Sequence, residues 1–180
     1  MKRGYQHIAR ERKHLRPLDS EHLRALALAY VGRYATSCAR LAAYLKRKIG
    51  ERGWADESVP PIDMIVTQFA ELGYVDDEAF AKARSGALLR RGYGPNRVRI
   101  SLRVSGIGTD IIDHAATLDD EVALTAALVF ARRKRIGPYS RDDITPVIRQ
   151  KMIAAMLRAG HSYDVSRKIL AMTANDSGEG

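Results

Sequence analysis

Apolar residues along the chain recur mostly three or four positions apart, which is the spacing of one face of an α-helix. Leu41, Leu45 and Ile49 follow this spacing, and Val98 and Leu102 repeat it further along the chain. We find no convincing run of alternating β-branched residues of the kind that would indicate a strand. The pattern therefore predicts an all-α fold.

Helix starts recur at regular intervals. Three segments open with an aliphatic residue, an Asp, a Ser or Asp, and a Glu. This order is typical of a helix N-terminus, because the first carboxylate accepts hydrogen bonds from unpaired backbone N–H groups. An Ala/Leu-rich stretch follows each start, and a helix-breaking residue follows 18 or 19 positions after the Asp. The Asp and break residues are Asp19 and Ser37, Asp76 and Pro95, and Asp119 and Pro138. The regularity predicts an internal repeat of about fifty residues.

Each break is followed by two further predicted helices. Pro95 suits a first helical position because its missing N–H has no partner there, and Gly106 suits the left-handed residue that ends a helix. The predicted helices cover residues 23–34, 41–49, 62–72, 80–91, 95–105, 109–116, 122–135, 147–158 and 163–172. A three-helix unit of this size buries little apolar surface alone, so neighbouring units must stack into an elongated body.

The chain is thereby divided into five segments. The first is a basic arm and the last an acidic, flexible tail. Between them lie three tandem three-helix repeats. The predicted boundaries are 1–17 for the arm, 18–73, 74–117 and 118–172 for the repeats, and 173–180 for the tail.

Basic residues outnumber acidic ones and are concentrated in clusters. The 180 residues include 30 Lys and Arg against 21 Asp and Glu, a formal net charge of +9. The stretch 79–109 contains basic residues but no acidic one, and residues 132–135 are a contiguous basic run. Such clusters attract polyanions. The alternative is that these side chains only solvate helix faces, although a solvated face usually carries both signs.

Other features limit the class of protein. The longest apolar stretch, 25–31, is too short to cross a bilayer. A single cysteine, Cys38, excludes an intramolecular disulfide and a Cys-rich zinc site, and we interpret it as a packed or incidental thiol. We therefore expect a cytoplasmic protein without membrane association.

Motifs for catalysis are missing from the sequence. It contains no phosphate-binding loop of the G-x-x-x-x-G-K-[ST] type, no G-x-S-x-G elbow and no isolated pair of acids in an apolar setting. We expect neither an enzyme nor a bound cofactor. His7, Glu11 and His14 fall on one helical face, but a flexible arm would hold a metal poorly, so we also expect no metal site.

The segment Gly92-Tyr93-Gly94 leaves two interpretations open. It is either a structural turn or a turn ahead of a helix whose free N–H groups hold a phosphate, with Arg97 close by.

A longer motif surrounds this segment. It consists of Gly73-Tyr74-Val75-Asp76-Asp77, Phe80, Gly92-Tyr93-Gly94-Pro95, Arg97-Val98, Leu102 and Gly106-Ile107. This arrangement resembles the core motif of the RecX family, bacterial regulators of the RecA recombinase. The resemblance extends to Ser37, Leu41, Leu45 and Lys48 in the first repeat, and to 132–139 and 157–160 in the third.

The resemblance implies a fold and a function. The fold is three tandem three-helix repeats forming a curved, elongated, monomeric molecule. The function is that of a non-catalytic regulator that binds the RecA filament on single-stranded DNA. It inhibits the ATPase, strand exchange and coprotease activities of RecA, and so modulates recombination, DNA repair and the SOS response. Contact with single-stranded DNA is expected, and double-stranded DNA is a further candidate. The alternative is a stand-alone basic α-helical protein that binds DNA without the recombinase.

The basic clusters supply the candidate contact residues. Arg99 and Arg103 lie four apart on one helix face, so we expect both to reach solvent. For Arg91 and Arg97 the alternative is a local salt bridge to Asp76 or Asp77. The predicted partner and DNA contacts are Arg90, Arg91, Arg97, Arg99, Arg103, Arg132, Arg133, Lys134 and Arg135, followed by Lys46, Arg47 and Lys48.

Overall fold

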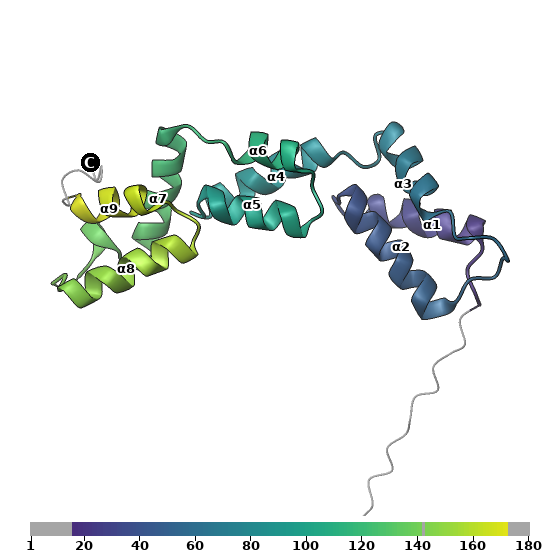
Figure 1. Ribbon diagram of the computed structural model, residues 1–180, viewed down its shortest axis with the longest axis horizontal. Coiled ribbons are helices and arrows are strands. Elements are labelled where there is room, and N and C mark those ends of the chain that lie inside the picture. The colour runs from purple at the N-terminus through teal and green to yellow at the C-terminus, as the bar shows by residue number, and fades with distance from the viewer. Residues whose placement is uncertain (1–15, 142, 173–180) are drawn as a thin grey trace, which may run out of the picture.

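Helices make up the regular structure of the part of the chain that is described. The computed structural model describes residues 16–141 and 143–172, and it contains no named strand within them. Figure 1 shows the helices in three groups that follow one another along an elongated, curved molecule. The helices are α1 (Ser20–Val31), α2 (Cys38–Arg52), α3 (Ile62–Glu71), α4 (Asp77–Arg90), α5 (Pro95–Val104), α6 (Thr109–Ala116), α7 (Asp120–Lys134), α8 (Pro146–Arg158) and α9 (Tyr163–Ala171), with a 3₁₀ turn, η1, at Gly137–Tyr139. The all-α prediction is confirmed.

Three helices form each group, which we name repeat 1 (α1–α3), repeat 2 (α4–α6) and repeat 3 (α7–α9). Each group has its own core of buried side chains. Leu41, Leu45, Val98 and Leu102, which set the helical pattern in the sequence, are all fully buried. The cores include Leu23, Leu41, Leu45, Ile65 and Phe69 in repeat 1, Ala81, Val98, Leu102 and Ile112 in repeat 2, and Ala127, Phe130, Met156 and Ile169 in repeat 3. We keep 18–73, 74–117 and 118–172 as the proposed division of the chain.

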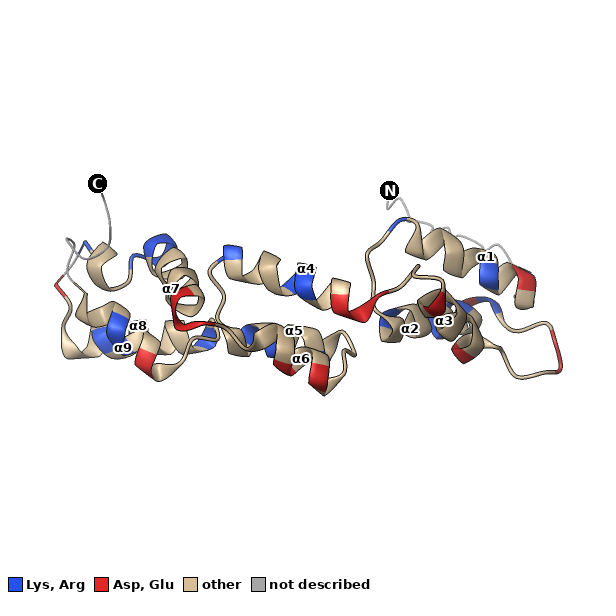
Figure 2. Cartoon of the chain, turned by 90° about the horizontal axis from the view of Figure 1, so that it is seen from above, with Lys and Arg blue, Asp and Glu red and all other residues tan. Residues whose placement is uncertain are grey.

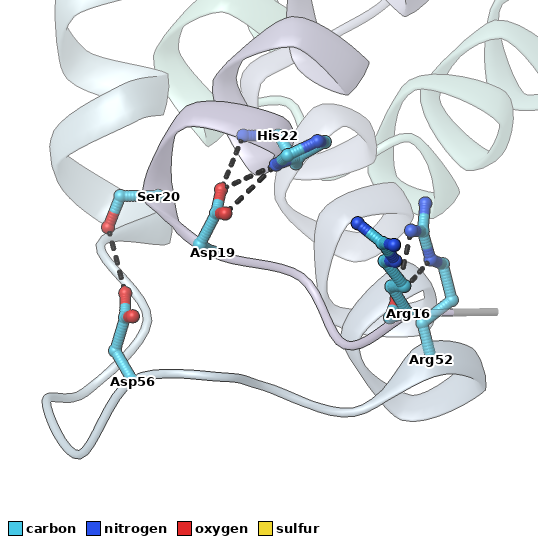
Figure 3. Close-up of polar contacts among 6 residues, drawn as sticks. All are labelled: Arg16, Asp19, Ser20, His22, Arg52 and Asp56. Atoms are coloured by element: carbon cyan, nitrogen blue, oxygen red, sulfur yellow. Dashed lines mark hydrogen bonds and ion pairs between the residues drawn. The ribbon is translucent and has the colours of Figure 1, made fainter.

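Two of the three predicted Asp caps form. Asp19 accepts a hydrogen bond from the backbone N–H of His22 at 2.8 Å, and its carboxylate also contacts the His22 ring (Figure 3). These bonds lower the pKa of Asp19 below its ordinary value. Asp76 accepts from the backbone N–H of Ala79 at 2.9 Å. Asp119 occupies the cap position of α7, but its side chain accepts no capping bond, so this prediction was wrong. The sequence specified the backbone conformation at that position but not the rotamer.

Left-handed residues end several helices. Gly106 has φ +72° after α5, as the sequence predicted, and Gly160 has φ +94° after α8. Both values lie where a side chain strains the backbone. Each glycine also brings its own repeat close to a neighbouring one.

The joint between repeats 1 and 2 is made by the start of α2. Ser37 donates from Oγ to the carbonyl of Ser105 at 2.6 Å. The backbone N–H of Cys38 donates to Oδ1 of Asp77 at 2.9 Å. A Cβ on Gly106 would overlap the side chain of Ala39, so the two repeats touch closely there. This joint is small and consists mainly of polar contacts.

The joint between repeats 2 and 3 is more extensive. The turn before α5 packs against the turn after α8, where the N–H of Gly94 donates to the carbonyl of Ala159 at 2.9 Å. A Cβ on Gly94 would overlap the backbone of Gly160. The side chain of Tyr93 packs against the cores of both repeats. Helix α4 also touches α7 directly.

The chain before α1 is held against the end of α2. The carbonyl of Arg16 accepts two hydrogen bonds from the Arg52 guanidinium, at 3.0 and 2.8 Å (Figure 3). Leu18 forms an isolated bridge with Trp54. The predicted arm before residue 16 and the predicted tail at 173–180 lie outside the described residues, as do His7, Glu11 and His14. None of the helices described has both the length and the apolar character needed to cross a membrane.

Candidate polyanion-binding surface

Helices α4 and α7 both carry acids in the first turn and bases in the last turn (Figure 2). Their C-terminal ends meet at the joint between repeats 2 and 3, where Nη1 of Arg133 donates to the carbonyl of Arg91 at 2.7 Å. This contact joins the two basic runs of the sequence. We name the result the joint cluster, consisting of Arg90, Arg91, Arg132, Arg133, Lys134 and Arg135, all exposed.

The ring of Tyr93 lies under two of these cations. The guanidinium carbons of Arg91 and Arg133 lie 5.6 and 5.7 Å from its centroid. Arg133 also lies 5.4 Å from the centroid of Phe130. Cation–π contacts of this kind hold guanidinium groups without neutralising them. The sequence motif contained Tyr93, but we did not identify it as part of the site, because its role depends on two cations from different repeats.

The last residue of the cluster has an unusual backbone. Arg135 caps α7 with φ +56°, and among the described residues it is the one non-glycine residue with a positive φ. Its conformation closes α7 and turns the chain toward η1.

Local salt bridges do not neutralise Arg91 and Arg97 within the described chain. The alternative was pairing with Asp76 or Asp77, but those carboxylates accept backbone bonds from Ala79 and Cys38. The ion pairs among described residues involve other side chains. In the joint cluster, bases therefore converge with no carboxylate paired to Arg90, Arg91, Arg133, Lys134 or Arg135 in the described part. Basic residues do favour helix C-termini, but the convergence of two such ends leaves a strongly positive surface.

The arginines of α5 are not part of this cluster. Arg97 and Arg103 are exposed, whereas Arg99 is only partly exposed. Nε of Arg99 lies 4.0 Å from Asp113 of α6, and Nη1 lies 3.4 Å from Asn96. Arg99 lines a hollow beside the first turn of α7, and the joint cluster lies at the last turn, so the length of α7, roughly 20 Å, separates them. Arg99 and Arg103 both reach solvent, Arg99 with 36% of its side chain exposed, but they lie apart from the joint cluster.

The basic residues of α2 lie in repeat 1, away from the other two groups. Lys46 is exposed. Arg47 and Lys48 pair with Glu51 at 3.7 and 2.6 Å, and both lie over the ring of Tyr44. The twelve predicted contact residues thus fall into three groups, of which the joint cluster is the largest.

The turn at Gly92-Tyr93-Gly94 is structural. The phosphate interpretation requires free N–H groups at the start of α5, but those of Gly94 and Asn96 donate to the carbonyls of Ala159 and Gly160. The backbone of repeat 3 thus occupies the position that a phosphate would need. Nε2 of the buried His161 also donates to the carbonyl of Gly92 at 3.1 Å. The phosphate interpretation was wrong, because the partners of the turn lie more than sixty residues away in the sequence.

Cys38 is partly buried at the joint between repeats 1 and 2. Burial, followed by the nearby charge of Asp77, raises the pKa of its thiol above the ordinary value. A thiol of this kind is a weak nucleophile at neutral pH. No group of three or more potential metal ligands occurs among the described residues.

The fold and this surface together define a class: an all-helical repeat protein that exposes a concentrated positive charge where two repeats meet. Comparison with known proteins gives a consistent result. The family model described as "RecX, second three-helix domain" matches residues 76–115. The "Regulatory protein RecX" of Myxococcus xanthus is 29% identical over 169 residues, which cover 88% of this chain and 89% of that protein. The protein of the same name from Halorhodospira halophila is 27% identical over 161 residues, covering 89% and 94%.

A solved structure has the same fold. The crystal structure of RecX from Lactobacillus salivarius superimposes with a TM-score of 0.67 at 20% sequence identity, covering 83% of this chain and 93% of that one. The chain thus matches the RecX family model over residues 76–115 and is similar over most of its length to proteins named RecX.

Proposed function

We propose that this chain is a non-catalytic regulator that binds the RecA filament assembled on single-stranded DNA. Bound there, it inhibits the ATPase, strand exchange and coprotease activities of the recombinase, and so modulates recombination, repair and the SOS response. Relatives named as regulatory proteins and the resemblance in the core motif support this proposal.

The joint cluster is the observation that carries the proposal. Its cations converge from two repeats. Within the described part of the chain, no carboxylate pairs with Arg90, Arg91, Arg133, Lys134 or Arg135. Their mutual repulsion is relieved when a surface rich in acids or phosphates approaches. An elongated molecule with such a surface suits a partner that is itself long and negatively charged.

Regulation without catalysis follows from differential binding. A protein that binds one state of a filament more tightly than another shifts the populations of those states. Inhibition of an ATPase then requires contacts only, and the chain needs no reactive group of its own.

The test is a titration of RecA ATPase activity. With ATP and single-stranded DNA present, we expect stoichiometric amounts of this protein to lower the rate of phosphate release. The variant carrying Arg90→Glu and Lys134→Glu reverses two exposed cations of the joint cluster. We expect it to require roughly tenfold more protein for the same inhibition.

A matched control carries Arg149→Glu and Lys151→Glu on α8, which are exposed cations outside the predicted site. It has the same net charge as the first variant and should inhibit like the unmodified chain. Equal loss in both variants would contradict a role for the joint cluster, since net charge alone would then explain the effect. Unchanged hydrolysis together with strongly salt-dependent DNA binding would instead support the stand-alone DNA-binding alternative.

A further inference from the structure

A groove in repeat 1 combines aromatic rings with cations. It lies between α1 and α2, with a volume of about 570 Å³. Three tyrosines and three bases supply most of its lining, and no carboxylate lines it. The lining residues are Ala29, Tyr30, Arg33, Tyr34, Tyr44, Arg47 and Lys48.

The tyrosines form a stepped set of rings. Tyr30 stacks on Tyr44, with centroids 4.1 Å apart and planes 14° apart. Tyr34 lies 5.3 Å from Tyr30 at 51°, so its ring is not stacked on that of Tyr30. Half of Tyr34 is exposed, at 52%. The stacked rings of Tyr30 and Tyr44 support each other, and the ring of Tyr34 beside them is accessible to solvent.

The cations are placed around these rings. Arg47 and Lys48 lie 5.6 and 5.8 Å from the centroid of Tyr44. Arg33, from the turn after α1, completes the lining. Glu51 pairs with Lys48 and Arg47 from outside the lining, and the hydrogen bond from Lys48 lowers the pKa of Glu51, which keeps that carboxylate charged. Lys48 and Arg47 thus share one carboxylate partner, whereas Arg33 has no carboxylate partner among the described residues.

We propose that this groove binds single-stranded nucleic acid by stacking an unpaired base on Tyr34 and holding the adjacent phosphates with Arg33 and Arg47. Proteins that bind single strands combine these two elements, because every base has a flat face and every nucleotide carries a charge. A duplex keeps its bases stacked on one another and cannot offer one to Tyr34. The groove should therefore prefer single strands, which a purely electrostatic surface would not.

The sequence predicted two cations of this site, Arg47 and Lys48, as contact residues, but not the tyrosines or Arg33. Tyr30 lies in the last turn of α1, Arg33 and Tyr34 lie in the turn that follows it, and Tyr44, Arg47 and Lys48 lie at helical spacing on α2. What the sequence does not show is that α1 and α2 bring the two sets to one groove. The proposal does not depend on the recombinase, because it concerns DNA alone.

The first experiment measures the affinity of the full chain for a fluorescent oligothymidylate. We expect Tyr34→Ala to weaken binding about tenfold, as loss of one base–aromatic stack does, and Tyr34→Phe to retain it. Tyr163→Ala is the matched control, since Tyr163 in repeat 3 is 54% exposed and also lies under an arginine, Arg167. It should bind like the unmodified chain. Equal losses for Tyr34→Ala and Tyr163→Ala would overturn the proposal.

Changes to the probe separate stacking from charge. An abasic strand of the same length has the phosphates without the bases, and we expect it to bind more weakly to the unmodified chain but equally to Tyr34→Ala. Glu51→Gln should strengthen binding of the oligothymidylate, because it frees Lys48 and Arg47. Equal affinity of the unmodified chain for the abasic strand, the duplex and the oligothymidylate would show a charged surface only and would overturn the proposal.

A second measurement locates the contact even if another cationic surface of the chain also binds DNA. An oligonucleotide that carries iododeoxyuridine crosslinks under ultraviolet light to aromatic side chains stacked on the modified base. Trypsin then releases Tyr34 in the peptide 34–40, and mass spectrometry identifies the crosslinked peptide. We expect the crosslink in that peptide or in 41–46, which contains Tyr44. A crosslink found only in other peptides would overturn the proposal, whereas the outcome of the RecA titration would be unaffected.

Discussion

The two joints between repeats are built differently, although they connect units of the same kind. Between repeats 1 and 2, contact rests on the start of α2, with two hydrogen bonds to repeat 2 and the close approach of Gly106 to Ala39. Between repeats 2 and 3, two turns interlock through their backbones, and one tyrosine packs against both cores. The second joint therefore fixes the relative position of its repeats more firmly than the first.

This difference has a consequence for the two candidate binding surfaces. The joint cluster needs cations from α4 and α7 to stay close together, and it lies at the interlocked joint. The tyrosine groove lies wholly within repeat 1, so its geometry does not depend on a joint at all. The joint between repeats 1 and 2, with its two hydrogen bonds, lies between these two surfaces.

The largest effect on stability is expected from adding a side chain at the joint between repeats 2 and 3, where two turns interlock. Gly94 has an ordinary φ of −83°, so Gly94→Ala adds no backbone strain, but its Cβ would overlap the backbone of Gly160. We expect the free energy of unfolding to fall by about 2–3 kcal/mol, as measured by urea unfolding followed by circular dichroism. Gly50→Ala in α2 is the control, because no atom lies within 4 Å of the new Cβ. That variant should gain about 0.5–1 kcal/mol, and a neutral Gly94→Ala would show that the two turns are not tightly packed.

A smaller effect is expected at the polar joint. Ser37→Ala removes a hydroxyl that is fully buried, that donates to Ser105 and that accepts from the N–H of Arg40. We expect a loss of about 1–2 kcal/mol, with faster amide hydrogen exchange in α2 and at the end of α5. Ser162→Ala removes a cap from α9 with no bond to another repeat, and should affect α9 alone. If both variants changed exchange only in their own helices, the Ser37 bond would not couple the repeats.

The smallest effect is a pH dependence of the interlocked joint. Burial lowers the pKa of His161, while its hydrogen bond to Gly92 opposes this in part. Since the pKa of the unfolded chain is about 6.5, the unfolded state binds a proton first as the pH falls. The contribution of His161 to stability is therefore complete above about pH 6.5 and declines below it, by at most about 1.4 kcal/mol per pH unit. Urea unfolding at a series of pH values should show this decline in the unmodified chain and a shallower one in His161→Gln. Identical slopes would rule out His161 as the cause.

The sequence predicted helices well because the signals that begin and end them are local. The predicted helix at 109–116 agrees with α6 at both ends, and Pro95 and Gly106 bound α5 as expected. Errors arose where a residue's role depended on a distant partner. The N–H groups of the turn before α5 donate hydrogen bonds to carbonyls of repeat 3. Asp119 lies at the cap position of α7, but its side chain accepts no capping hydrogen bond.

The candidate site could be predicted only in part for the same reason. Charge runs in the sequence identified Arg90, Arg91 and residues 132–135, and the fold then brought the two runs together. Arg99 reaches solvent as expected, but the sequence did not predict its contact with Asp113 of α6, which packs beside α5. The role of Tyr93 could not be predicted from the sequence, because it depends on cations from two repeats that lie over its ring.

Arg135 adds a positive charge at the end of α7 but holds an unfavourable backbone conformation there. A left-handed backbone costs a residue with a side chain roughly 1 kcal/mol compared with glycine, and glycines carry that conformation after α3, α5 and α8. At the end of α7, an arginine adopts it instead. A glycine at position 135 would remove this backbone strain but would also remove one guanidinium from the joint cluster. The positive charge of the cluster is therefore accompanied by a strained backbone at the end of α7.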